Sequence, residues 1–280
     1  MNNFEKNKAD FAEAAMDCFT DERDYKILES DRYTFFMLSR IMGGECQLLL
    51  TDHERLIICF TCCPYPVWIW SPDDMTEEEK EKAYKLVKEN GLLTEGQTFN
   101  LKYDIADYFI KRSSKDNMIL SIQKNMLAYD CPKPIEPHTQ TDGELYRCTE
   151  EDIDELSEFT ELFHTETGID RDSLQAYRRK TEESIKSSSY FFWKNAEGKH
   201  TAVCHLRPNG STAGVGLVYT RKEYRRMHYA ENLVYQVTKT ARDAGYMPTL
   251  YTDADYAASN ACYRKIGYIL KGKLCTIGRE

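Results

Sequence analysis

The chain of 280 residues is long enough for one large domain or two of ordinary size, and 41% of its residues are hydrophobic, as in globular proteins. Its formal net charge of −9 argues against a broad nucleic-acid-binding surface, which needs clustered Lys and Arg. Met1–Asp10 lacks the apolar core of a signal peptide, and no apolar run approaches the roughly 20 residues that span a membrane. We therefore expect a cytoplasmic protein with reduced thiols and with neither nucleic acid nor a membrane as partner.

The first half predicts a mixed α/β domain. Apolar residues at helical spacing predict a helix within Phe4–Phe19. A capping box of Thr76 and Glu79 opens a predicted helix that reaches Glu89. Short segments rich in aromatic or branched residues predict an antiparallel meander over Arg32–Leu38, Cys46–Leu50, Leu56–Cys62 and Val67–Trp70. Further elements are expected at Asn100–Tyr103 (strand), Ile105–Lys111 (helix) and Met118–Ile122 (strand).

Three cysteines invite a metal hypothesis. Cys59, Cys62 and Cys63 lie in the apolar run Leu56–Trp70, and no second Cys or His pair follows at a zinc-finger spacing. Cysteine in such a run behaves as a small hydrophobic residue. We therefore expect buried structural thiols and no metal site.

The segment Cys131–Pro137 holds three of the chain's 8 prolines, and a polar stretch continues to Gly143. This composition is typical of a linker. We therefore predict an N-terminal domain over 1–131, a linker over 132–143 and a second domain over 144–280.

The second half alternates strands and helices. A capping box at Thr149 and Asp152 opens a predicted helix with Ile153, Leu156 and Phe159 on one face. Asn209-Gly210 is a strong hairpin signal. The other predicted strands are Leu145–Arg147, Tyr190–Trp193, Thr201–Leu206, Ala213–Tyr219, Thr249–Thr252 and Tyr268–Ile277. The other predicted helices are Asp172–Ile185, Ala230–Ala244 and Ser259–Ile266.

A strand, a short turn and a helix follow one another in Val215–Ala244, and the turn contains Arg225-Arg226-Met227-His228-Tyr229-Ala230. The start of a helix offers unpaired backbone N–H groups and the positive end of a dipole. Arg225 and Arg226 add positive charge. This turn is therefore a candidate site for an anion such as a pyrophosphate.

Together these segments resemble the GNAT superfamily of N-acetyltransferases. The turn is similar to the family's coenzyme A signature, R/Q-x-x-G-x-G/A. Ser259–Tyr268 is similar to a late helix of the family, and both motifs occur in the family's order over roughly residues 144–280. The resemblance implies an α/β GNAT-like acyl-CoA N-acyltransferase fold with a mixed sheet in the C-terminal half. It leaves open that the mixed α/β N-terminal domain is a degenerate copy of that fold, since family members with two such units exist.

The resemblance also implies acetyl-CoA as cosubstrate and a small-molecule or peptide amine as acceptor. Backbone groups of Val218, Tyr219 and Thr220 would hold the pantetheine arm and polarise the thioester carbonyl. Asn260 would hydrogen-bond the pantetheine, and Tyr263 would protonate the departing thiolate, although Tyr263 also fits as an aromatic that packs beside Ile266. The N–H groups that would hold the pyrophosphate are those of Arg226, Met227, His228, Tyr229 and Ala230.

Two features leave the function open. His228 replaces the glycine of the signature, and glycine lets a backbone approach a phosphate closely. The general base is not identified, with Glu223, Asp253, Asp255 and His205 as candidates. The leading prediction is direct acetyl transfer to an amine. The alternative is a catalytically silent acyl-CoA-binding or regulatory module, and oligomeric state stays open, with a homodimer as one option.

Overall fold

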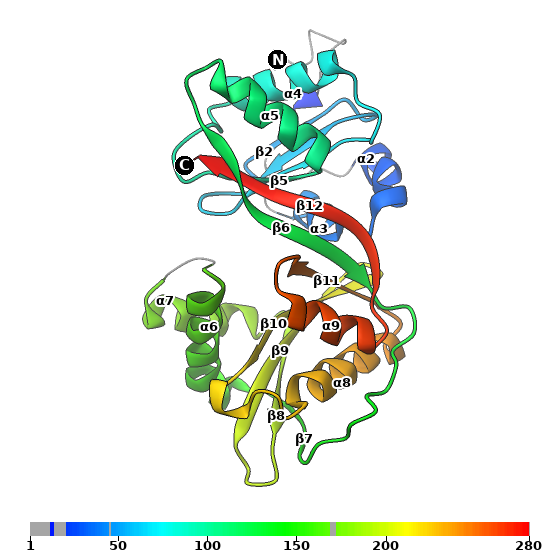
Figure 1. The fold of residues 1–280 in the computed structure, drawn as a ribbon, viewed down its shortest axis with the longest axis vertical. Helices are drawn as coiled ribbons and strands as arrows, with labels where there is room; N and C mark the ends of the chain where they lie inside the picture. Colours follow the sequence, from blue (N-terminus) through cyan, green and yellow to red (C-terminus); the bar gives the residue numbers. More distant parts are fainter. Residues whose placement is uncertain (1–11, 14–20, 45, 169–171, 280) are drawn as a thin grey trace. The chain divides into compact units, whose positions relative to one another are not determined.

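The computed structural model describes residues 12–13, 21–44, 46–168 and 172–279 (Figure 1). The chain separates into two compact units. Unit 1 takes the described residues of Met1–Ala128 together with Thr252–Asp255 and Lys271–Glu280, and unit 2 takes Tyr129–Tyr251 and Tyr256–Leu270. None of the described helices combines the length and apolar character needed to cross a membrane.

The sheet of unit 1 places its strands in the order β1-β2-β3-β4-β5-β12. Neighbours pair antiparallel except β4 and β5, which are parallel. The strands are β1 (Ala12–Glu13), β2 (Leu48–Thr51), β3 (Ile57–Phe60), β4 (Val67–Trp70), β5 (Thr98–Leu101), most of β6 (Leu120–Asp130) and most of β12 (Ile269–Arg279). The helices are α2 (Glu22–Ile27), η1 (Leu28–Asp31), α3 (Phe36–Met42), α4 (Glu77–Glu89) and α5 (Tyr103–Ser114).

Helices α4 and α5 form the core of unit 1 with its sheet. Tyr84 of α4 and Phe109 of α5 meet edge to face with ring centroids 5.3 Å apart, and both belong to one buried cluster with strand residues such as Phe99 and Ile277. The predicted capping box at α4 is present, because Thr76 and Glu79 bond each other's backbone N–H groups. The predictions for α4, α5 and the strands β2 to β5 are thus confirmed within a few residues.

Three predictions in this half fail in whole or in part or cannot be assessed. The strand expected at Arg32–Leu38 is wrong, because α3 begins at Phe36. The buried residues Phe35, Leu38 and Met42 recur at helical spacing, a period that the aromatic composition concealed. The helix expected within Phe4–Phe19 lies outside the described residues, apart from the two residues of β1. Cys59 is buried as predicted, whereas Cys62 is half-buried and Cys63 exposed, because both follow the end of β3.

Unit 2 contains a sheet with the order β11-β10-β9-β8-β7, in which only β10 and β11 pair in parallel. The strands are β7 (Glu144–Arg147), β8 (Ser189–Lys194), β9 (His200–Asn209), β10 (Thr212–Thr220) and β11 (Met247–Asp253). The helical elements are η2 (Glu150–Asp152), α6 (Ile153–Thr167), α7 (Leu174–Ser184), η3 (Lys222–Tyr224), α8 (Tyr229–Asp243) and α9 (Ala257–Lys265). The elements predicted for this half are found within a few residues, but the last predicted strand, Tyr268–Ile277, is β12 and belongs mostly to unit 1.

Helices cover both faces of this sheet (Figure 1). On one face, Phe159 of α6 packs against Phe192 of β8 and Tyr219 of β10. On the other face lies α8, which contacts β8, β9 and β10 and buries Leu233 and Val237. The first half of β9 is buried on both faces, as expected for a strand between two layers of helices.

Segment 132–143, predicted as a linker, is fastened to unit 2 along its length. Ile135 donates its N–H to the carbonyl of Ile266. Asp142 accepts hydrogen bonds from the Trp193 indole and from the Tyr229 hydroxyl. The prolines remove donors from this segment, but its carbonyls still accept. The observed units also differ from the predicted 144–280 boundary, because the last ten residues join unit 1, where β12 pairs with β5.

Candidate active site

Strand β10 changes course near its end. Its parallel pairing with β11 covers Thr212–Gly214, and its register against β9 shifts between Gly216 and Tyr219. Leu217, inside this bulge, has a φ of 47°. A bulge bends a strand and releases backbone groups from the ladder. Val218, Tyr219 and Thr220 therefore lie beyond the stretch paired with β11, as a backbone site for a ligand requires.

The turn before α8 has an unusual backbone. Arg226 and His228 both adopt left-handed conformations, with φ of 62° and 61°. His228 is the N-cap of α8, a helix of 15 residues. The N–H groups of a helix's first turn have no acceptor within the helix, and the dipole there favours an anion. Arg226, Met227, His228, Tyr229 and Ala230 thus form a turn and a helix start, where backbone N–H groups suit an anion.

The left-handed backbone explains the glycine that His228 replaces. Glycine adopts positive φ without steric cost, and histidine is among the side chains that tolerate it best. The His228 ring turns to Glu231 in the first turn of α8, with 3.2 Å between Nδ1 and Oε2. The substitution therefore preserves the backbone conformation but leaves an acidic side chain beside the helix start.

Arg225 is directed elsewhere. Its guanidinium donates to the Thr220 carbonyl at 3.1 Å and to Glu166 at 2.6 Å, and it lies over the Tyr219 ring. The hydrogen bond that Arg225 donates to Glu166 raises the pKa of Arg225. Tyr256, just before α9, also donates to Glu166. Arg225 therefore ties the turn to the end of α6, and Glu166, which no sequence signal marked, joins three parts of the site.

Asn260 and Tyr263 lie three residues apart on α9, and both are nearly buried, with 3% and 7% of their surface exposed. The Asn260 amide donates to the Tyr256 carbonyl, and its oxygen accepts from Tyr129. The Tyr263 ring meets Tyr268 edge to face at 5.8 Å, and burial raises its pKa above the usual 10. The structure thus brings both predicted residues to one helix face and engages them in packing and hydrogen bonds.

Comparison with known proteins identifies this arrangement. Residues 153–268 match the family model described as acetyltransferase (GNAT) family. These residues form a GNAT domain. The matched range contains the bulged β10, the turn before α8 and the helix α9, so the family match and the geometry concern the same part of unit 2.

Solved structures extend the similarity in fold to both units. A Drosophila protein is 12% identical, with a TM-score of 0.65 over 96% of this chain and 98% of that one. A GCN5-related N-acetyltransferase from Sphaerobacter thermophilus is also 12% identical, with a TM-score of 0.64 over 98% and 96% of the two chains. A GCN5-related N-acetyltransferase-like protein from Streptococcus suis has 11% identity and a TM-score of 0.56 over 92% and 99%. No curated protein matches the chain by sequence.

The four candidates for a general base lie in different segments of the chain. Asp253 ends β11 and Asp255 precedes α9, and both lie within the matched residues 153–268 although they cluster with unit 1. Glu223 is exposed in η3, between β10 and α8. His205 lies on β9 directly opposite Gly216, at the beginning of the bulge. Among the four, His205 is therefore the one that pairs with the bulged strand.

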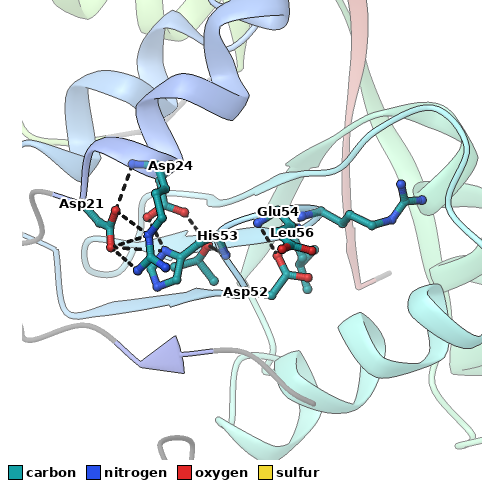
Figure 2. Close-up of polar contacts among 9 residues, drawn as sticks. Asp21, Asp24, Asp52, His53, Glu54 and Leu56 are labelled. Atoms are coloured by element: carbon teal, nitrogen blue, oxygen red, sulfur yellow. Dashed lines mark hydrogen bonds and ion pairs between the residues drawn. The ribbon is translucent and has the colours of Figure 1, made fainter. Parts of the chain in front are cut away.

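Unit 1 contains a separate cluster of titratable side chains, shown in Figure 2. Asp24 is fully buried, accepts from the Thr51 hydroxyl and lies 2.8 Å from His53 Nδ1. The ligand atoms of Asp21, Asp24 and His53 lie within 4.8 Å of one another, a size that suits a cation. The Arg23 guanidinium, however, donates to both carboxylate oxygens of Asp21. Arg23 thus supplies positive charge to the cluster, which fastens α2 to β2.

Proposed function

We propose that this protein transfers the acetyl group of acetyl-CoA to a primary amine. The observation that carries the proposal is the bulged end of β10 followed by a turn with two left-handed residues and the start of α8. Acetyl-CoA supplies the acetyl group as an activated thioester. The donor set fits such a molecule, because backbone N–H groups at a helix start suit a pyrophosphate and free strand edges suit an amide-bearing arm.

In this proposal, backbone groups provide most of the contacts to acetyl-CoA. The N–H groups from Arg226 to Ala230 hold the pyrophosphate. Backbone groups of Val218, Tyr219 and Thr220 hold the arm and stabilise negative charge on the carbonyl oxygen. Donors fixed by a strand and a helix require little reorganisation when charge develops, which makes such stabilisation effective.

Tyr263 is proposed to be the proton donor for the departing thiolate. A thiol and a phenol differ by about 1.5 pKa units, so this transfer is uphill by about 2 kcal/mol before the environment acts. Burial raises the pKa of Tyr263, which keeps the phenol protonated and makes it a weaker acid. Tyr263 therefore serves first as a hydrogen-bond donor to the developing thiolate.

A thermal shift with acetyl-CoA and a thiol-release assay test the proposal. At 100 times Kd, a ligand adds about 2.7 kcal/mol of stability. The assay uses four acceptors of different chemistry: n-butylamine, spermidine, glycine and Ala-Ala-Ala. We expect a thermal shift and turnover with at least one of them. For Tyr263→Phe we expect kcat to fall at least tenfold with an unchanged thermal shift. The absence of both shift and turnover in the wild type would refute the proposal.

The second candidate function is a silent acyl-CoA-binding module. It is favoured by His228 in the place of the glycine and by Glu231, whose carboxylate approaches the same helix start. A thermal shift with acetyl-CoA without turnover of any of the four amines would identify this function. The same pair of measurements thus separates enzyme from binder.

A further inference from the structure

Three residues of unit 2 form a row across neighbouring strands. Tyr190 of β8 lies opposite His205 of β9, and His205 lies opposite Gly216 of β10. Residues directly opposite in antiparallel strands point to the same face of the sheet. Tyr190 belongs to the buried cluster under α6, so the whole row lies on the α6 face.

The first two positions of this row are fixed in place. The Tyr190 and His205 rings stack with centroids 4.5 Å apart and an interplanar angle of 23°. The Tyr190 hydroxyl is 2.5 Å from Ser184 Oγ at the end of α7. Tyr190 is thus held at both ends, and the His205 ring has a defined plane.

The third position is open. A Cβ atom built on Gly216 meets no heavy atom within 4 Å, and its φ lies outside the positive range that would demand glycine. A glycine inside a strand weakens that strand and often marks the close approach of a ligand. Gly216 is also the last residue before the register shift, and the carbonyl-binding backbone of the proposed function follows it directly.

We propose that the space over Gly216 receives the acceptor's amino group and that His205 is the general base that removes its proton. This inference rests on the proposed function. An ammonium N–H bond breaks as a bond from that proton to an imidazole nitrogen forms, which leaves a lone pair on the amine. The imidazolium then returns the proton to solvent, and the neutral amine is the nucleophile that acetyl transfer needs.

The surroundings of the row suit this role. Arg207, two residues further along β9, is close enough to act electrostatically on the Tyr190 hydroxyl. Arg207 therefore adds a positive charge to the surroundings of the row. The other titratable groups at the row are the Tyr190 phenol and the Cys148 thiol. Burial raises the pKa of both, so they stay neutral near pH 7.

Two substitutions test the inference. Gly216→Val fills the open space with a side chain that strands favour, so it should fold and bind acetyl-CoA normally. We expect it to raise KM for the acceptor at least tenfold. His205→Gln should lower kcat at least a hundredfold and remove the fall of kcat/KM toward low pH. His138→Gln, an exposed histidine of the same unit, is the matched control and should behave as the wild type.

A readout without turnover completes the test. Imidazole NMR signals assigned to His205 by comparison with His205→Gln should shift when n-butylamine is added to the wild type with bound coenzyme A. They should not shift in Gly216→Val. If the wild type acetylates an amine while both variants keep its KM, kcat and pH profile, this inference is wrong and the proposed function stands. If the wild type neither binds acetyl-CoA nor turns over, both are wrong.

Discussion

At the scale of single residues, the backbone conformation explains a substitution that the sequence left ambiguous. His228 holds a φ of 61° where the family signature has glycine. The motif predicted which positions form the turn, but it could not predict that Arg225 would bind Glu166. Glu166 lies 59 positions before Arg225 in the chain, so a local sequence pattern contains no information about this contact.

Substitutions at His228 distinguish the effect of its backbone conformation from the effect of its imidazole side chain. For His228→Gly we expect stability within about 1 kcal/mol of the wild type, because relief of the left-handed strain offsets the greater freedom of the unfolded chain. His228→Ala retains the strain and loses the contact with Glu231, so it should be less stable than His228→Gly. Acetyl-CoA affinity should change less than threefold in both, because the N–H remains. Thermal unfolding and calorimetric titration measure these quantities, and a loss above tenfold would show that the imidazole itself binds the ligand.

At the scale of elements, capping signals located two helix starts well, whereas α3 was predicted as a strand and α2 was not predicted. Capping boxes at Thr76 and Thr149 fixed the starts of α4 and of the η2–α6 segment within a residue or two. No sequence signal marks the bulge in β10, because the composition of residues 216–219 is typical of a regular strand. A bulge depends on how a strand pairs with its neighbours, which is a tertiary effect.

The start of α4 makes a pH-dependent contribution to the stability of the fold. The pKa of Glu79 is lowered to about 2, first by the Arg55 side chain and then by the Thr76 N–H. A carboxyl with a depressed pKa stabilises the fold above its unfolded pKa, near 4.5, and the effect is lost as pH falls toward 2. Glu79→Gln keeps a capping box but loses the charge, so we expect a loss of about 1 kcal/mol at pH 7 after solvent screening.

Urea unfolding at pH 7, 5 and 3 measures the Glu79 contribution. The difference between Glu79→Gln and the wild type should persist at pH 5 and shrink by more than half at pH 3. Glu78→Gln, at an exposed neighbouring position on α4, provides the control and should show no such change. An effect of Glu79→Gln that is equal at all three pH values would show that the ion pair with Arg55 contributes nothing.

At the scale of the whole molecule, each compact unit combines segments that are not consecutive in the chain. The sequence predicted a division near residue 131 from the prolines and the polar stretch that follows them. The structure instead returns Lys271–Glu280 to unit 1, where β12 pairs with β5 through Cys275–Leu101 and Ile277–Phe99. No local pattern could predict this, because the partners lie more than 170 residues apart and both strands have ordinary strand composition.

Unit 1 should therefore depend on the end of the chain. Ile277 is fully buried in the cluster that contains Phe99 and Phe109. Ile277→Ala leaves a cavity there and should destabilise unit 1 by about 2–5 kcal/mol. Two of the three tryptophans, Trp68 and Trp70, lie in unit 1, so fluorescence in a Trp193→Phe background reports on that unit. Lys273→Ala, at an exposed position of the same strand, should leave the midpoint unchanged. If Ile277→Ala also leaves the unit 1 midpoint unchanged, β12 is dispensable for that unit.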